Sequence, residues 1–216
     1  MRCWPCGRRC LPPDAAAVIP SPAPRAWAAC SLGFALAALL LWSAPRPALD
    51  WQAQWALAQP WRFWTAAFVH WSAQHLQANL VGCIAVAAFG FAAQVPLRVS
   101  WAWLTAWPLT HALLALAPQL QHYGGLSGVL HAGVAVVALH LTLRASGRRC
   151  AIGGAVLIGL AVKLLLERPW QGPTQLVPGW DIALAPLAHV TGAASGLLCG
   201  VIAEGVTRNR TRSAAA

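Results

Sequence analysis

Six long stretches with almost no charged residues dominate this sequence of 216 residues. A helix that crosses a membrane needs about 20 mostly apolar residues, and these stretches reach or approach that length. Charged residues make up only 9% of the chain, whereas a soluble domain carries roughly a quarter. We therefore expect an integral membrane protein rather than a soluble or a disordered chain. The predicted spans cover residues 26–44, 77–93, 100–118, 125–143, 150–167 and 182–203.

The basic residues indicate how these spans are oriented, because cytoplasmic loops carry an excess of Lys and Arg. With six spans the two ends of the chain share one side, which holds eleven Arg residues against three on the other. We expect a multi-pass protein of the bacterial inner membrane with both termini in the cytoplasm. Two basic tails, 1–25 and 204–216, then flank a membrane domain over 26–203. The charge of +10 lies in clusters between apolar stretches, so the expected partner is the lipid bilayer and not nucleic acid.

The segment between the first two spans, residues 45–76, is rich in tryptophan. It holds five of the thirteen Trp residues, and Trp prefers the headgroup level of a membrane, where its ring is buried and its N–H stays hydrated. We expect this segment on the periplasmic side, together with the loops 119–125 and 168–181. The predicted fold is an all-α bundle of six spans with an interfacial loop between spans one and two.

A serine between glycines stands at the outer start of the fourth span, in Gly124-Gly125-Leu126-Ser127-Gly128. The glycines let another chain segment approach closely and leave the Ser127 hydroxyl uncovered. The free N–H groups of a helix N-terminus also favour a developing negative charge. A nucleophile and part of an oxyanion hole could therefore share one turn. The alternative is that these small residues only pack helices together.

A histidine in the sixth span could serve this serine as a general base. His189 lies about seven residues into the apolar run, which corresponds to a depth of about 10 Å, similar to that of Ser127. Gly192, Gly196 and Gly200 follow at intervals of four residues and give the helix one flat face for close packing. If span four packs there, the imidazole can reach the hydroxyl. A structural hydrogen bond between the two side chains is the alternative.

Side-chain donors at the top of the second span could complete an oxyanion hole. His75 and Asn79 are four residues apart and share one helix face. Trp61, Arg62 and His70 precede them. His70 and His75 lack helix-face spacing, and no Cys or carboxylate converges on them, so no metal site is predicted. The seven Cys predict no disulfide framework. Cys3, Cys6 and Cys10 in the first tail are assigned no function.

Taken together, these residues resemble the rhomboid family of intramembrane serine proteases over residues 61–200. The family's motifs occur in the right order along the chain. The Trp-Arg motif of the interface loop matches Trp61 and Arg62, and the span-two motif matches His70, His75 and Asn79. The Gly-x-Ser-Gly motif matches Gly125, Ser127 and Gly128, and the motif of span six matches His189, Gly192 and Gly196.

The resemblance implies a Ser127–His189 dyad with no acidic third member and no cofactor. His75, Asn79 and the Ser127 N–H would hold the oxyanion. The chain contains only five acidic residues, and none is expected near enough to orient His189 at its depth. Lys163 and Glu167, four residues apart in span five, are interpreted as a buried ion pair with a structural role.

One departure from the family concerns His131, which stands where many rhomboids carry a Tyr packed on the catalytic His. As residue i+4 from Ser127 it is a rival base, although we expect it to pack beside the dyad. The stretch around Ser127 and His131 is similar to the rhombosortase branch, as is the Lys163–Glu167 pair in span five. That branch implies membrane-anchored substrates whose C-terminal sorting tail has a Gly-Gly motif, one hydrophobic span and basic residues.

Two other functional classes fit parts of the sequence. A catalytically inactive rhomboid-like protein would bind client proteins, but such relatives usually lack the Ser or the His. A small transporter could use the intramembrane His and Lys as a proton path. It would show inverted repeats and broken helices, and we find no such symmetry.

Overall fold

The computed structural model describes residues 22–213, with side chains described as far as residue 206, and these residues are mostly helical. The predicted tails therefore lie partly outside the described residues, as do Cys3, Cys6 and Cys10. The long helices are α1 (Ala23–Leu40), α4 (Ala73–Ala92), α5 (Leu97–Ala112), α6 (Ser127–Arg144), α7 (Gly147–Leu166) and α8 (Pro186–Ser213).

Five of these helices are long and apolar enough to cross a membrane, which makes the chain a multi-pass membrane protein of mostly helical fold. The exception among the six predicted spans is α5, which ends at Ala112 after 16 residues and contains Pro108. It continues into the 3-10 helix η3 (Leu113–Leu116) and lies within the bundle against α1, α6 and α8. The count of six spans therefore stays a prediction.

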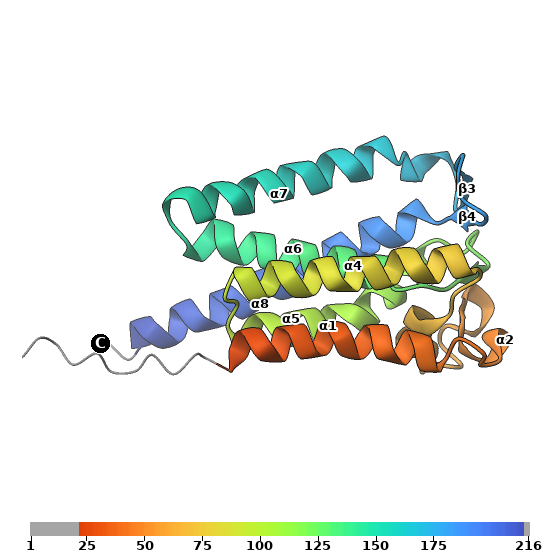
Figure 1. Cartoon of the computed structure of the whole chain (residues 1–216), viewed down its shortest axis with the longest axis horizontal. Helices are drawn as coiled ribbons and strands as arrows, with labels where there is room; N and C mark the ends of the chain where they lie inside the picture. Colours follow the sequence, from red (N-terminus) through yellow and green to blue (C-terminus); the bar gives the residue numbers. More distant parts are fainter. Residues whose placement is uncertain (1–21, 214–216) are drawn as a thin grey trace, which may run out of the picture.

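All short elements outside the long helices gather at one end of the bundle (Figure 1). Residues 45–72 form α2 (Arg46–Leu49), β1 (Trp51–Gln52), η1 (Ala53–Trp55), α3 (Arg62–Thr65) and η2 (Ala66–Phe68). Three of the five Trp residues of this segment are exposed, whereas Trp51 is fully buried. The remaining elements are β2 (His122–Tyr123), η4 (Pro169–Gln171), β3 (Gln175–Leu176) and β4 (Ala183–Leu184).

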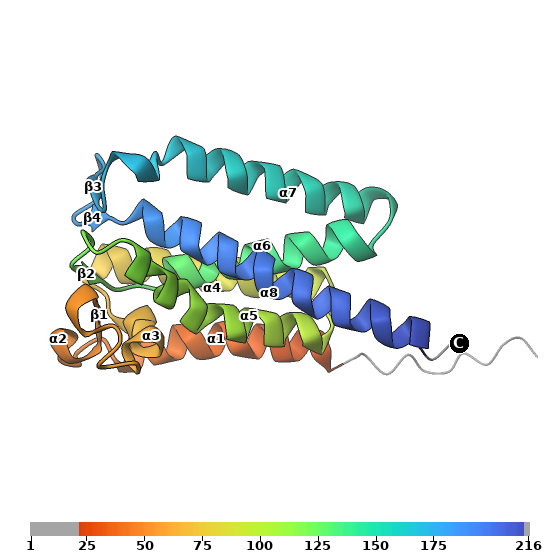
Figure 2. The ribbon, with the colours of Figure 1, turned by 180° about the vertical axis from the view of Figure 1, so that it is seen from behind.

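The opposite end of the bundle holds the starts of α1, α5 and α7 and the ends of α4, α6 and α8, as seen from both sides in Figures 1 and 2. The Arg residues of the described chain concentrate at that end, with eight there against three at the end with the short elements.

A short antiparallel pairing ties the first loop to the chain just before Ser127. Strand β1 pairs with β2 in the register Trp51 opposite Tyr123 and Gln52 opposite His122. The Gly125 N–H also donates to the Ala66 carbonyl at 2.9 Å. The segment before α6 is therefore held by residues that lie 59 to 72 positions earlier in the sequence.

Paired tryptophans fill the core between α1, α4 and α5. The rings of Trp27 and Trp103 stack with centroids 4.3 Å apart. Their N–H groups donate to the carbonyl oxygens of Val86 at 2.8 Å and Val129 at 2.7 Å. Each buried ring thus fills space while its polar atom is satisfied, as buried N–H groups require.

Helices α6 and α8 pack in close backbone contact, which two glycines of α8 make possible. A Cβ atom added at Gly192 would overlap the Gly128 carbonyl oxygen, and one at Gly196 would overlap that of Ala132. Gly128 in turn lies against the Ala188 carbonyl oxygen. This contact holds the start of α6 beside the first turns of α8.

We expect Gly192→Ala to lower the free energy of unfolding by about 1–3 kcal/mol, the usual cost of overpacking a close contact. Thermal unfolding of the detergent-solubilised protein measures this as a lower Tm. Gly154→Ala on α7 is the matched control, because no atom lies within 4 Å of its added Cβ. An unchanged Tm for Gly192→Ala would show that the two helices do not depend on this contact.

Candidate active site

Ser127 is the first residue of α6, at the end of the bundle that carries the short elements. The preceding turn needs glycine, since Gly125 has a φ of 127°, a region that other residues rarely adopt. An added Cβ there would also lie 2.6 Å from His75 Nε2. The turn therefore presses against α4 and leaves the Ser127 hydroxyl at the helix start, where N–H groups are free.

His189 of α8 meets Ser127 directly. Its Nε2 lies 3.1 Å from Ser127 Oγ, which is hydrogen-bond distance for a nucleophile and its base. The His189 side chain is buried. The glycine contact between α6 and α8 explains this geometry, since His189 lies one turn before Gly192 and Ser127 immediately precedes Gly128.

The expectation that no acidic residue lies near His189 is wrong. Glu167 Oε2 lies 2.8 Å from His189 Nδ1. Glu167 caps the C-terminus of α7 at the same end of the bundle. The sequence predicted that span five ends at Glu167. However, the depth of Glu167 relative to His189 depends on how α7 lies against α8, and the sequence does not specify that placement.

The interpretation of Lys163 and Glu167 as a buried, self-contained pair needs the same correction. The two residues do form an ion pair, through Lys163 Nζ and Glu167 Oε1. However, the Lys163 side chain is 45% exposed, and the second carboxylate oxygen is used by His189. The pair is therefore part of the site rather than a separate structural feature.

His131 packs against the ring of His189 and contacts the backbone of Ser127. The two imidazole rings stack with centroids 4.3 Å apart and an interplanar angle of 13°. His131 Nδ1 is 2.6 Å from the Ser127 carbonyl oxygen, to which it donates, whereas the Ser127 hydroxyl faces His189. His131 therefore lies beside Ser127 and His189, as we expected.

His75 and Asn79 line the opposite side of the Gly125 turn. His75 Nδ1 accepts from the Trp71 N–H at 3.5 Å, which leaves the proton on Nε2, the atom that faces Gly125. Asn79 Nδ2 donates to the His75 carbonyl at 3.2 Å and lies near Gly125. Both side chains thus present N–H groups close to the start of α6.

Tyr123 is a contact of the serine turn that the sequence analysis missed. Its hydroxyl donates to the Gly125 carbonyl at 3.1 Å, accepts from the Gly128 N–H at 3.4 Å and lies 3.4 Å from Ser127 Oγ. Burial raises the pKa of Tyr123, so the phenol stays neutral and keeps its proton. It is the only Tyr of the chain, and its place four residues before Ser127 was the available signal.

His70 precedes the start of α4 and packs against the ring of His75. The ring centroids are 4.8 Å apart, and His70 Nδ1 donates to the Phe68 carbonyl at 3.2 Å. Burial lowers the pKa of His70 to about 4, so its ring is neutral at physiological pH. It supports the position of His75 and does not contact Ser127.

A cavity of about 880 Å³ opens onto these residues. Its walls come from α4, α6, α7 and the start of α8, and residues 174–186 cover one side. Gln74 and Ser72 at the start of α4 bind that covering segment, through the Gly179 carbonyl at 2.7 Å and Asp181 Oδ1 at 2.7 Å. The lining residues described above are His75, Asn79, Tyr123, Ser127, His131, Lys163, Glu167 and His189.

Comparison with protein families matches residues 57–204 to the Rhomboid domain, which is well over half of the chain. The chain belongs to the rhomboid family. Members of this family are intramembrane serine proteases. Comparison with curated protein sequences gave no match.

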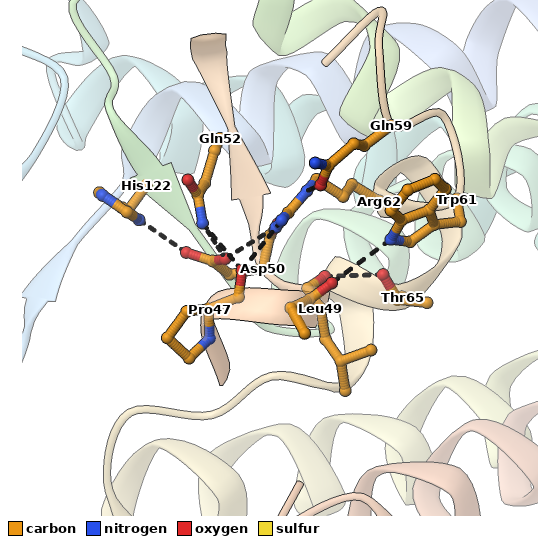
Figure 3. Close-up of polar contacts among 10 residues, drawn as sticks. Pro47, Leu49, Asp50, Gln52, Gln59, Trp61, Arg62, Thr65 and His122 are labelled. Carbon is orange, nitrogen blue, oxygen red and sulfur yellow. Dashed lines mark hydrogen bonds and ion pairs between the residues drawn. The ribbon is translucent and has the colours of Figure 1, made fainter. Parts of the chain in front are cut away.

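The Trp-Arg motif of this rhomboid lies away from Ser127, in a polar cluster of the first loop (Figure 3). The Arg62 guanidinium is buried and donates to Asp50 Oδ1 at 3.0 Å, to Gln59 Oε1 at 2.7 Å and to the Pro47 carbonyl at 2.9 Å. Trp61 is exposed, and its N–H donates to the Ala48 carbonyl at 3.3 Å.

Asp50 is the centre of this cluster, a role that the sequence analysis did not foresee. Its carboxylate is only 1% exposed and also binds Gln52 Nε2 at 2.7 Å and His122 Nδ1 at 2.7 Å. His122 belongs to β2, five residues before Ser127. The Trp-Arg motif therefore connects the first loop to the strand that leads into the serine turn.

We expect Arg62→Met to destabilise this rhomboid by about 3–5 kcal/mol, because it leaves the buried Asp50 carboxylate without its guanidinium. The neighbouring Arg46→Met is the control, since it removes only a contact over the Trp42 ring at 5.7 Å, which is worth about 0.5–1 kcal/mol. Thermal unfolding in detergent compares the two variants. Equal effects would contradict the importance of the Asp50 cluster.

Proposed function

We propose that this rhomboid is an intramembrane serine endopeptidase with Ser127 as nucleophile and His189 as general base. The observation that carries the proposal is the distance of 3.1 Å between Ser127 Oγ and His189 Nε2 at the wall of a large cavity. The geometry also favours His189 over His131 as the base, because His131 donates to the Ser127 carbonyl oxygen instead.

The reaction would proceed through an acyl-enzyme. Ser127 Oγ attacks the scissile carbonyl carbon while its proton passes to His189 Nε2. The carbonyl oxygen becomes an oxyanion, stabilised by the Ser127 N–H and by the side chains of His75 and Asn79. The C–N bond then breaks as His189 returns the proton to the leaving amine, and a water molecule activated by His189 hydrolyses the ester.

The substrate would be a membrane-tethered protein cleaved near the periplasmic end of its anchor. A peptide bond within a helix is inaccessible because its carbonyl is hydrogen-bonded, so the substrate must unwind locally. Glycine weakens a helix by about 1 kcal/mol relative to alanine. The stretch around Ser127 and His131 is similar to the rhombosortase branch. The cleaved segment would therefore be a C-terminal tail with a Gly-Gly motif, one hydrophobic span and basic residues.

The distribution of Arg residues supports cleavage on the periplasmic side of the membrane. The end of the bundle with more Arg would face the cytoplasm, in agreement with cytoplasmic termini in the bacterial inner membrane. Ser127 lies at the other end, which would face the periplasm. A released product would then leave the membrane as a secreted or surface protein.

The proposal predicts cleavage of a reporter that carries such a sorting tail, co-reconstituted with the rhomboid in liposomes. The parent protein should release the reporter by a cut near the glycines, located by mass spectrometry. Ser127→Ala and His189→Gln should abolish release. Replacement of the two glycines of the tail by leucine should reduce release at least about tenfold, since more energy is needed to unwind the helix.

Ser195→Ala is the matched control for the nucleophile, because Ser195 Oγ is buried on α8 and has no hydrogen-bond partner among the described residues. It should retain activity, as should His131→Ala to a large extent. Release by Ser127→Ala at the parent rate would contradict the proposal. Binding of the reporter without cleavage by the parent would favour the inactive client-binding protein instead.

A further inference from the structure

We infer that Glu167 is a positioning residue for His189, so that this site works as a Ser127–His189–Glu167 triad. The inference rests on the proposed function and adds a third member to its machinery. Glu167 Oε2 lies 2.8 Å from His189 Nδ1, and His189 Nε2 lies 3.1 Å from Ser127 Oγ. Ser127 belongs to α6, His189 to α8, and Glu167 directly follows the last residue of α7.

The carboxylate fixes which imidazole nitrogen carries the proton. A carboxylate can only accept, so His189 Nδ1 must be the protonated nitrogen at this contact. Nε2 is then free to accept the proton of the Ser127 hydroxyl, as a general base requires. Without the carboxylate, both tautomers of His189 are available, and one of them points an N–H at Ser127 and cannot act as base.

The two carboxylate oxygens have separate partners. Oε1 binds Lys163 Nζ, one turn earlier on α7, and Oε2 binds His189. Lys163 thus holds the carboxylate in the orientation that faces α8. The net charge of the group is zero at rest, and it is zero again when His189 is protonated opposite the oxyanion.

The position of Glu167 on its own helix also indicates a role beyond helix stability. It caps the C-terminus of α7, where the negative end of the helix dipole disfavours an acidic side chain. The helix stops there because Arg168 adopts a left-handed conformation, with a φ of 49°, before Pro169. Because α7 ends there, the Glu167 carboxylate lies where it can contact His189.

The other acidic residues of the described chain are occupied elsewhere. Asp50 binds Arg62, Asp181 binds Ser72, and Glu204 binds Arg144 at the opposite end of the bundle. Glu167 is therefore the only carboxylate among the described residues in contact with His189. The titratable groups that surround His189 are His131 on α6, Lys163 and Glu167 on α7, and His75 on α4.

The test measures the rate at which a fluorescent fluorophosphonate labels the full-length protein in detergent between about pH 5 and 9. Glu167→Gln should lower the rate at pH 7.5 by about 10²-fold, within the range expected for loss of a correctly poised general base. Its amide can donate to Nδ1 and so favours the wrong tautomer. The acid limb of the pH profile should move to lower pH, and Glu167→Asp should restore part of the rate.

The variant Lys163→Gln distinguishes a positioning role of Glu167 from a purely structural role of its ion pair with Lys163. It removes the same ion pair but keeps the carboxylate beside His189, so it should lower the rate less than about tenfold. The double variant Lys163→Gln, Glu167→Gln carries no unpaired charge and should stay as slow as Glu167→Gln. If the pair were only structural, both single variants would lose labelling equally and the double variant would recover it.

The outcomes distinguish this inference from the proposed function. Labelling of the parent but not of Ser127→Ala, with Glu167→Gln as fast as the parent and the same pH profile, would overturn the triad and leave the protease intact. A folded parent that does not label at all would overturn both. Imidazole ¹⁵N NMR, assigned with His189→Gln, reads the tautomer without activity: Nδ1 should carry the proton in the parent, and an unchanged spectrum in Glu167→Gln would overturn the role of the carboxylate.

Discussion

The close contact between α6 and α8 is the constraint on which the rest of the site depends. Gly192 and Gly196 admit the backbone of α6 at Gly128 and Ala132. The proposed nucleophile Ser127 directly precedes Gly128, and the proposed base His189 lies one turn before Gly192. The distance between Ser127 and His189 is therefore set by two backbones and not by two flexible side chains. In a membrane, where no hydrophobic effect drives helices together, contacts between small residues are the main means of such close packing.

The other parts of the molecule align this contact with its surroundings. The Asp50 cluster and the pairing of β1 with β2 fix the strand that leads into the serine turn. The Tyr123 hydroxyl stabilises that turn through hydrogen bonds with Gly125 and Gly128. Helix α7 differs, because it lies at the edge of the bundle (Figure 1) and few of its residues are buried. It nevertheless delivers Lys163 and Glu167 to the cavity.

The sequence predicted the features that depend on local pattern. Span boundaries from hydropathy lie within a few residues of α1, α4, α6 and α7, since apolar length is a local property. Ser127 and His189 could be paired because each stands among small residues at a similar depth. Glu167 was missed because its distance from His189 depends on the lateral placement of α7. Asp50 was missed because a contact with Arg62, twelve residues away in an irregular loop, leaves no periodic signal.

The most direct test of the account is to locate the covalent adduct of a fluorophosphonate by mass spectrometry. The intact protein should gain the mass of one phosphonyl group, and peptide mapping should place it on Ser127, with no adduct in His189→Gln under the same conditions. An adduct on another residue, or one on Ser127 that forms equally well without His189, would contradict the claim that the contact between α6 and α8 creates the nucleophile.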